Sequence, residues 1–325
     1  MTTENAPRAA SRDEVPVIDL ADTDLSKLAG KMRDACRNSA FFYIANHGVA
    51  APVVEGAFRE AWRFFGLPLE ERMQVVKNRF HRGYLPLGTT QYPGRKKDLK
   101  DSFDLGVDLA LDDPDVLAGL PLHGPNQWPD HLPGFREAVE AYFEAVQQAG
   151  LRTLRVLALS LGQAEDFFTN FYAKPTVTTR LIHYPKPEEV VDEDFGIGAL
   201  AHTDYGHITI LAQDPGGGLE IALPSGEWIS APYIEGTFVV NLGDLTARWT
   251  NDVYRSNLHR VVNRLGRDRL SIPTFMNPTH RTVVECIATC MGPDHPAKYE
   301  PVLAGEYVTN KIRSNQGYQA PPAAA

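Results

Sequence analysis

The sequence predicts a mainly β fold with flanking helices, in which the second half of the chain forms a sandwich or barrel. Two observations predict it. After Thr176 the apolar segments become short and are separated by turn sequences such as DPGGG and PSGE. Before that residue, apolar side chains recur at helical spacing. Because no Pro-, Ser- or Gly-rich linker separates the two halves, we expect N-terminal helices that buttress a jelly-roll core within one folded unit.

The first half of the chain combines short strands with amphipathic helices. One helix is predicted to begin near Pro52 and to end at Gly66, because proline is favoured in a first helical turn and glycine at a helix end. A longer helix follows from apolar residues at steps of three and four after Phe135. The elements expected before residue 176 are strands at 15–20 and 41–44 and helices at 25–40, 51–66 and 135–161.

The second half contains eight candidate strands, which suit a jelly roll because that fold arranges eight strands in two sheets around an interior mouth. They are 177–184, 198–213, 218–223, 227–232, 237–243, 258–263, 269–277 and 282–287.

The expected organisation has four parts. We expect a disordered leader over 1–14, a mixed helical region over 15–175 that packs on the barrel, the β-strand core over 176–290, and a C-terminal segment over 291–325. Within that last segment, residues 303–318 are expected to cover the barrel mouth as a helix before a disordered tail.

Composition narrows the class of partner. The chain has 325 residues, of which 43% are hydrophobic, and a net charge of -9. It can bury a full core, and its acidity argues against nucleic acid as a partner. No apolar stretch approaches the length that spans a bilayer, and the N-terminus lacks the features of a signal peptide. Three cysteines are too few for a disulfide framework, so we expect a reducing, cytoplasmic location and no membrane partner.

The segment AHTDYGHITIL, residues 201–211, places two histidines and an aspartate in a predicted strand. Residues two apart on a strand share a face, so His202 and Asp204 are expected to point the same way. His207 has the opposite parity and is expected to point away from them.

His259 is the candidate third partner, because it begins another strand-like run after a polar turn. Two imidazoles and one carboxylate on converging strands form a facial triad, which holds ferrous iron and leaves positions open for other ligands. An isolated H-x-D pair is more often a hydrogen-bonded surface pair, so further residues must decide between the two interpretations.

Arg269 and Ser271 supply such a signal, since they share one face of a later strand. A guanidinium and a hydroxyl on one face suit a carboxylate ligand. An arginine that points into a barrel is costly to bury unless an anion pairs with it. A salt bridge to a distant Asp or Glu remains the alternative interpretation.

These motifs together resemble the isopenicillin N synthase-like branch of the iron(II)/2-oxoglutarate oxygenases. The residues that carry the resemblance are AHTDYGHITILAQDPGGGLEI, FVVNLGDLTARWTNDVYRSNLHRVVN and RLSIPTFMNP, with VPVIDL, FFYIANHGV and RGYLPLG nearer the N-terminus. The resemblance extends from about residue 15 to 310. It implies a double-stranded β-helix core, a mononuclear iron site and a small-molecule substrate.

Carried over by position, the resemblance assigns three iron(II) ligands: His202, Asp204 and His259. It also implies that Arg269 and Ser271 hold the distal carboxylate of 2-oxoglutarate, with a phenolic hydrogen bond from Tyr184. One departure from the family pattern is His183, where plant members typically have asparagine.

The implied reaction uses 2-oxoglutarate and O2 as cosubstrates and releases succinate and carbon dioxide. A ferryl-oxo intermediate then hydroxylates, desaturates or cyclises a small metabolite, as in secondary metabolism, and no catalytic side chain is needed beyond the metal centre. The main alternative is an iron(II) oxidase of the isopenicillin N synthase type that does not use 2-oxoglutarate. A non-catalytic jelly-roll binding protein and a zinc hydrolase are the remaining alternatives.

Substrate contacts are expected mainly from residues 79–106, which resemble the substrate-side region of the family. Phe275 and Asn277 have the strand parity of Arg269 and join them as candidates. The candidates within 79–106 are Arg82, Tyr84, Tyr92, Arg95, Lys96 and Phe103.

Overall fold

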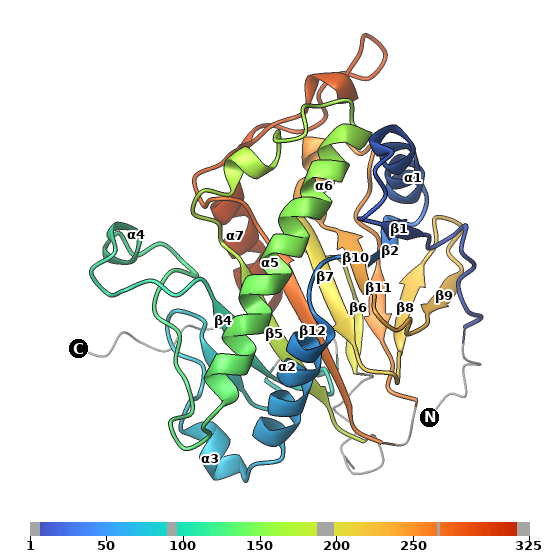
Figure 1. Ribbon diagram of the computed structural model, residues 1–325. Coiled ribbons are helices and arrows are strands. Elements are labelled where there is room, and N and C mark those ends of the chain that lie inside the picture. The colour runs from blue at the N-terminus through green and yellow to red at the C-terminus, as the bar shows by residue number, and fades with distance from the viewer. Residues whose placement is uncertain (1–6, 90–95, 187–197, 265–266, 317–325) are drawn as a thin grey trace.

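The structure is a computed structural model that describes residues 7–89, 96–186, 198–264 and 267–316 (Figure 1). Within these residues, an eight-stranded sheet has the order β1-β2-β10-β7-β12-β5-β4-β3 and a four-stranded sheet has the order β6-β11-β8-β9. The strands are β1 (Val17–Asp19), β2 (Phe41–Ala45), β3 (Gly83–Leu85), β4 (Asp101–Gly106), β5 (Thr178–Tyr184), β6 (Ala199–His202), β7 (Ile208–Gln213), β8 (Leu219–Ala222), β9 (Trp228–Ala231), β10 (Phe238–Leu242), β11 (His259–Val261), β12 (Arg269–Met276), β13 (Val283–Val284) and β14 (Val302–Leu303).

The helices lie mostly on one side of the large sheet (Figure 1). The longest helix packs against β12 and against two other helices, α1 and α2, so that the three form a layer over the sheet. The α-helices are α1 (Leu25–Asn38), α2 (Ala51–Phe65), α3 (Leu69–Met73), α4 (Pro114–Leu117), α5 (Phe135–Ser160), α6 (Asp244–Trp249) and α7 (Ala304–Gln316). None of the helices in the described part of the chain has the length and apolar character that a membrane span requires.

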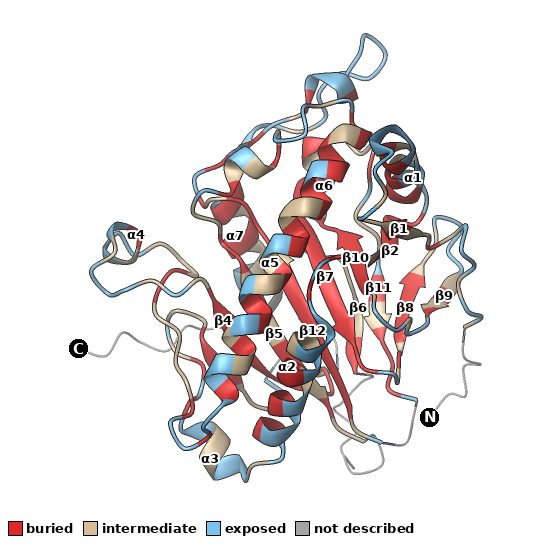
Figure 2. Ribbon diagram, viewed as in Figure 1, coloured by how far each residue is buried: buried red, intermediate tan, exposed pale blue. Residues whose placement is uncertain are grey.

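Strand β2 shows how the sequence builds the two layers. Phe42 and Ile44 face the helices and belong to the main hydrophobic core. Phe41 and Tyr43 face the opposite way and pack with residues of β8 and β9, such as Ile221, in a second core between the sheets. Figure 2 shows the result, with the central strands buried and the outer face of α5 exposed. The predicted jelly roll with N-terminal helices is therefore confirmed.

The segment 198–213 differs from its prediction as one strand, because it forms β6 in the small sheet and β7 in the large sheet. The loop between these strands is held by the N-terminal N–H groups of α6. Asp244 N donates to Asp204 O at 2.7 Å, and Leu245 N donates to Gly206 O at 3.0 Å. Unpaired N–H groups at a helix start thus satisfy the carbonyls of a loop that leaves both sheets.

Strand β4 was not among the expected strands, and it lies in the segment 79–106 that was expected on the substrate side. It is instead fully buried between β3 and β5. Its acids tolerate burial because cations pair with them: Arg72 reaches Asp101 at 2.6 Å, and Lys77 reaches Asp104 at 2.7 Å.

The structure also differs from the prediction near both ends of the chain. Residues 7–14 were expected as part of a disordered leader, but they lie against the small sheet. Ala10 N donates to Ser230 O at 2.8 Å, and Arg8 pairs with Glu227 at 2.8 Å. The predicted strand 282–287 shortens to β13, which pairs with β14 outside the two main sheets.

The contact between α6 and the loop after β6 predicts the effect of one substitution. A Cβ atom at Gly243 would lie 2.3 Å from Gly206 O and 3.0 Å from Asp204 O, and both are backbone atoms that cannot rotate away. We expect Gly243→Ala to lower the free energy of unfolding by about 1–3 kcal/mol, as overpacking does.

The matched control is Gly30→Ala in α1, where an added Cβ meets nothing within 4 Å. This change is expected to raise stability by up to about 1 kcal/mol through helix propensity. Thermal denaturation of both variants checks the pair, and a Gly243→Ala protein as stable as the parent would contradict the proposed close packing.

Candidate active site

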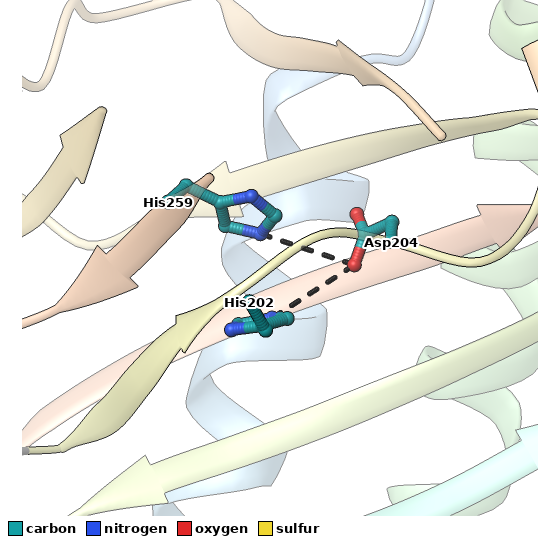
Figure 3. A group of neighbouring side chains, drawn as sticks. All are labelled: His202, Asp204 and His259. Atoms are coloured by element: carbon teal, nitrogen blue, oxygen red, sulfur yellow. Dashed lines mark ion pairs between the residues drawn. The ribbon is translucent and has the colours of Figure 1, made fainter. Parts of the chain in front are cut away.

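Three side chains converge where β6 meets β11 (Figure 3). His202 ends β6, Asp204 follows in the loop, and His259 begins β11 as the direct antiparallel partner of His202. Asp204 Oδ1 lies 3.9 Å from His202 Nε2 and 3.8 Å from His259 Nε2. One ligand atom from each residue lies within 4.8 Å of the others, which is close enough to hold a single metal ion.

Hydrogen bonds aim all three groups at a common point. The Nδ1 atoms of His202 and His259 lie 2.7 Å and 3.3 Å from the carbonyl oxygens of Leu200 and Asn257, which leaves each Nε2 facing the site. Such a contact fixes the imidazole tautomer that a metal requires.

The carboxylate is oriented in the same manner. Thr209 Oγ1 donates to Asp204 Oδ2 at 2.6 Å, and Asn241 Nδ2 donates to the same oxygen at 2.7 Å. The other oxygen, Oδ1, therefore faces the two histidines. Two imidazole nitrogens and one carboxylate oxygen, each held by hydrogen bonds on its far side, are the donor set of a ferrous facial triad.

The protonation states also fit a cation. Burial, followed by the neighbouring His259, lowers the pKa of His202 to about 4, so its imidazole is neutral at pH 7. Burial alone would raise the pKa of Asp204, but the two histidines and its hydrogen bonds hold that pKa below its ordinary value. Metal binding needs these deprotonated forms.

Two cavities, called inner and outer below, meet at His202 and Asp204, and they also share Lys100, Arg180 and Phe275 as lining residues. The inner cavity has a volume of about 70 Å³ and is also lined by Tyr184, Ser271 and His259. The outer cavity has a volume of about 120 Å³. Its other lining residues include Lys77, Asp104, Arg180, Phe275, Asn277, Val308 and Ile312.

Arg269 lies beside the inner cavity and is fully buried. Its guanidinium stacks over the Tyr184 ring at 4.7 Å, and its Nε donates to Gly217 O. Its Nη1 and Nη2 atoms have no hydrogen-bond partner within the described part of the chain, and no described carboxylate forms an ion pair with it. A buried cation with two orphaned nitrogens fits an anionic ligand and does not fit the alternative of a structural salt bridge.

Some of the residues expected on the substrate side line the outer cavity, whereas others pack in the interior. Phe275 and Asn277 line the outer cavity. Arg82 instead donates to Leu122 O at 2.9 Å, Tyr84 donates to Asp101 at 2.8 Å, and Phe103 packs in the hydrophobic core. These three side chains hold β3 and β4 in place and do not line either cavity.

Of the remaining candidates from that segment, the structure describes Lys96 alone. Lys96 is exposed and is not among the described residues that line the cavities. Tyr92 and Arg95 lie outside the described residues.

The other two histidines near these motifs point away from the site, and His207 does so from the loop before β7. His207 is fully buried against Phe168 and Trp249, and burial lowers its pKa to about 3. His183 lies 2.8 Å from Asp101 and 3.2 Å from Asp268. Burial opposes its protonation, yet the two carboxylates raise the pKa of His183 overall.

Sequence reasoning missed two kinds of residue. Asn241 and Thr209, which orient Asp204, lie in apolar strands, and a single asparagine in the buried sequence FVVNL was the available signal. The ion-paired residues of the outer cavity were missed because nothing in the sequence links Lys77, Asp104 and Arg180, which come from separate segments.

Comparisons with known proteins agree with this geometry. Residues 170–278 match the 2OG-Fe(II) oxygenase superfamily, and residues 15–131 match the family described as non-haem dioxygenase in morphine synthesis N-terminal. The 2-oxoglutarate-Fe(II) type oxidoreductase hxnY of Emericella nidulans is 38% identical over 90% of this chain and 86% of its own. Kihadalactone A synthase LFS of Citrus sinensis is 34% identical over 92% and 93% of the two chains.

Solved structures are similar over almost the whole length. A full-length Neurospora crassa protein, solved in complex with alpha-KG, aligns with a TM-score of 0.81 and 30% identity, over 94% of this chain and 99% of that chain. The dioxygenase for auxin oxidation in rice aligns with a TM-score of 0.75 and 26% identity, over 95% and 98% of the two chains.

The site geometry predicts different outcomes for two buried histidines. His259→Ala removes a nitrogen that faces the site and is expected to weaken Mn(II) or Fe(II) binding by at least about a hundredfold. His207→Ala is expected to leave metal affinity unchanged while lowering the free energy of unfolding by about 2–5 kcal/mol, because it empties a packed position.

Calorimetric titration of each folded variant with Mn(II) measures its metal affinity. Thermal denaturation of the same variants measures the change in the free energy of unfolding. Loss of metal binding in His207→Ala, or full binding in His259→Ala, would show that the site has been assigned to the wrong histidines.

Proposed function

The chain belongs to the 2OG-Fe(II) oxygenase superfamily and is a 2-oxoglutarate-dependent oxygenase, and we propose that it oxidises a C–H bond of a small-molecule substrate, by hydroxylation in the first instance. In this proposal iron(II) is held by His202, Asp204 and His259. The distal carboxylate of 2-oxoglutarate is held by Arg269 and Ser271, with Tyr184 beside them.

One observation carries the proposal: a buried arginine with two unpartnered nitrogens lies beside a cavity that ends at the His-Asp-His group. An arginine fork matches two carboxylate oxygens, and the hydroxyl of Ser271 adds a further donor. An acid that spans the inner cavity therefore finds a cation at one end and the metal ligands at the other. This arrangement supports the use of 2-oxoglutarate over the oxidase alternative, as does the name of the Emericella nidulans relative.

Iron(II), when bound with 2-oxoglutarate and O2, supplies an oxidant strong enough to remove hydrogen from a C–H bond. The protein's own contribution is positional. His202, Asp204 and His259 would hold the metal through three ligand atoms and would leave its other coordination positions for ligands. The carboxylate of Asp204 would add a negative charge that favours higher oxidation states of the metal, and Asn241 and Thr209 hold this carboxylate in place through hydrogen bonds.

The two cavities divide the ligands. The inner cavity suits the cosubstrate because it ends at Ser271 and Tyr184, beside Arg269. The outer cavity suits the substrate, because it reaches His202 and Asp204 but is not lined by Ser271 or Tyr184. Burial of the site keeps water from the reacting groups.

The proposed role of Arg269 predicts a specific loss. Arg269→Gln is expected to raise the dissociation constant of 2-oxoglutarate by at least about 30-fold, because one partner of a buried charged pair is lost. Isothermal titration of the Mn(II)-loaded protein measures this without turnover.

Arg37→Gln is the control, because Arg37 is exposed on α1 and is distant in sequence from the residues of the site. An unchanged dissociation constant for 2-oxoglutarate in Arg269→Gln would remove the carboxylate-binding role.

A further inference from the structure

A large groove adjoins the outer cavity and is not used by the function proposed above. It has a volume of about 810 Å³ and lies between the turn 79–81, the segment 111–123 with helix α4, and the last described turns of α7. We call it the distal groove. His81, Leu122 and Ile312 line both the distal groove and the outer cavity, so the two hollows meet at these three side chains.

The surface of the distal groove is mainly apolar. Leu111 and Leu117 line it and are 59% and 73% exposed. Phe80, Val116 and Leu120 add partly exposed apolar surface to the same groove. Single exposed apolar side chains are ordinary on a protein surface, but several that line one hollow are typical of a ligand-binding site.

The polar groups of the distal groove are satisfied by local contacts or by solvent. Thr309 Oγ1 donates to a carbonyl oxygen one turn earlier in α7 at 2.6 Å, and His123 Nδ1 lies 2.8 Å from the carbonyl oxygen of Pro121. Arg79 and Arg313 are exposed, so water hydrates their charges. Apolar contact is therefore what the distal groove chiefly offers to a ligand.

The three side chains at the junction of the two hollows carry no charge at pH 7. Leu122 and Ile312 are apolar. Burial, followed by the nearby Lys77, lowers the pKa of His81 to about 4, so its imidazole is neutral. An apolar chain at this junction therefore does not displace water from an ion, which would be costly.

The outer cavity alone accommodates only a small ligand. Its volume of about 120 Å³ suits a group of about six carbon atoms, since a cavity of about 150 Å³ holds benzene. His202 and Asp204 line this cavity but not the distal groove. A ligand that reaches both the metal site and the exposed leucines must therefore extend through the junction.

We propose, on the basis of the function proposed above, that the substrate is an elongated and predominantly apolar molecule. Its reacting end lies in the outer cavity next to the metal site. Its body passes His81, Leu122 and Ile312 and lies against Leu111 and Leu117 in the distal groove. The two leucines are thus specificity-determining residues that select for length and apolar character.

A series of uncharged alcohols of increasing length tests the proposal. 1-Butanol, 1-hexanol, 1-octanol and 1-decanol are titrated by calorimetry into protein loaded with Mn(II) and saturated with 2-oxoglutarate. Each buried methylene group strengthens binding by up to about fourfold, so we expect decanol to bind at least about tenfold more tightly than hexanol. A ligand confined to the outer cavity would gain nothing beyond about six carbon atoms.

Leu117→Asp provides the decisive variant, because it places a charge in the distal groove at an exposed position that does not fill the core. We expect decanol to lose its advantage over hexanol, while the affinities for hexanol and 2-oxoglutarate persist. Leu111→Asp makes the same change elsewhere in the groove and is expected to act alike, should the first variant fail to fold. Leu25→Asp, at a 49% exposed leucine of α1, is the control and is expected to keep the full advantage.

Proton NMR of 1-decanol locates the other end of the chain. The unpaired electrons of Mn(II) broaden the signals of nearby protons, whereas Zn(II) has no unpaired electrons. We expect broadening in the Mn(II) protein that is strong at one end of decanol and declines along the chain, relative to the Zn(II) protein. Equal spectra with the two metals would place decanol away from the metal site and overturn the proposal.

The outcomes separate this inference from the proposed function. Decanol that binds no more tightly than hexanol, or not measurably, would overturn the elongated substrate, as would an undiminished advantage of decanol in the folded groove variants. If 2-oxoglutarate still binds the Mn(II) protein in that case, the proposed function stands. Failure of 2-oxoglutarate to bind the Mn(II) protein would instead remove the proposed function and this inference with it.

Discussion

The orientation of Asp204 is the constraint on which the rest of the site depends. One carboxylate oxygen is held by Thr209 and Asn241, so the other must face the two histidines. Asp204 lies in the loop where the chain leaves the small sheet for the large one, and α6 fixes the carbonyls of that loop. Both sheets and a helix start are therefore needed to place one oxygen atom, which explains why a site of three residues requires a whole jelly roll.

Buried charge organises the space around that oxygen. The protein is acidic overall, yet it places cations at both cavities: Arg269 beside the inner one, Lys77 in the outer one and Arg180 in both. Ions in the interior are unfavourable unless they are paired. The terminal guanidinium nitrogens of Arg269 have no hydrogen-bond partner among the described residues, so the inner cavity is suited to an anionic ligand.

The three candidate metal ligands were predictable from the sequence, whereas most of the residues that line the cavities were not. His202, Asp204 and His259 come together as predicted, although the reason differs from strand alternation, because Asp204 lies beyond the end of β6. Local spacing reports which residues share a motif. It does not report ion pairs between distant segments, so β4 was not expected. Three of the residues expected on the substrate side, Arg82, Tyr84 and Phe103, pack internally instead.

The most direct test of the account is the visible absorption spectrum of the protein with iron(II), recorded without oxygen before and after 2-oxoglutarate is added. A metal held by His202, Asp204 and His259, next to an acid anchored at Arg269, predicts a weak charge-transfer band that requires both components. Iron binding without that band after 2-oxoglutarate is added would contradict the assigned cosubstrate site. Failure to bind iron at all would contradict the metal site itself.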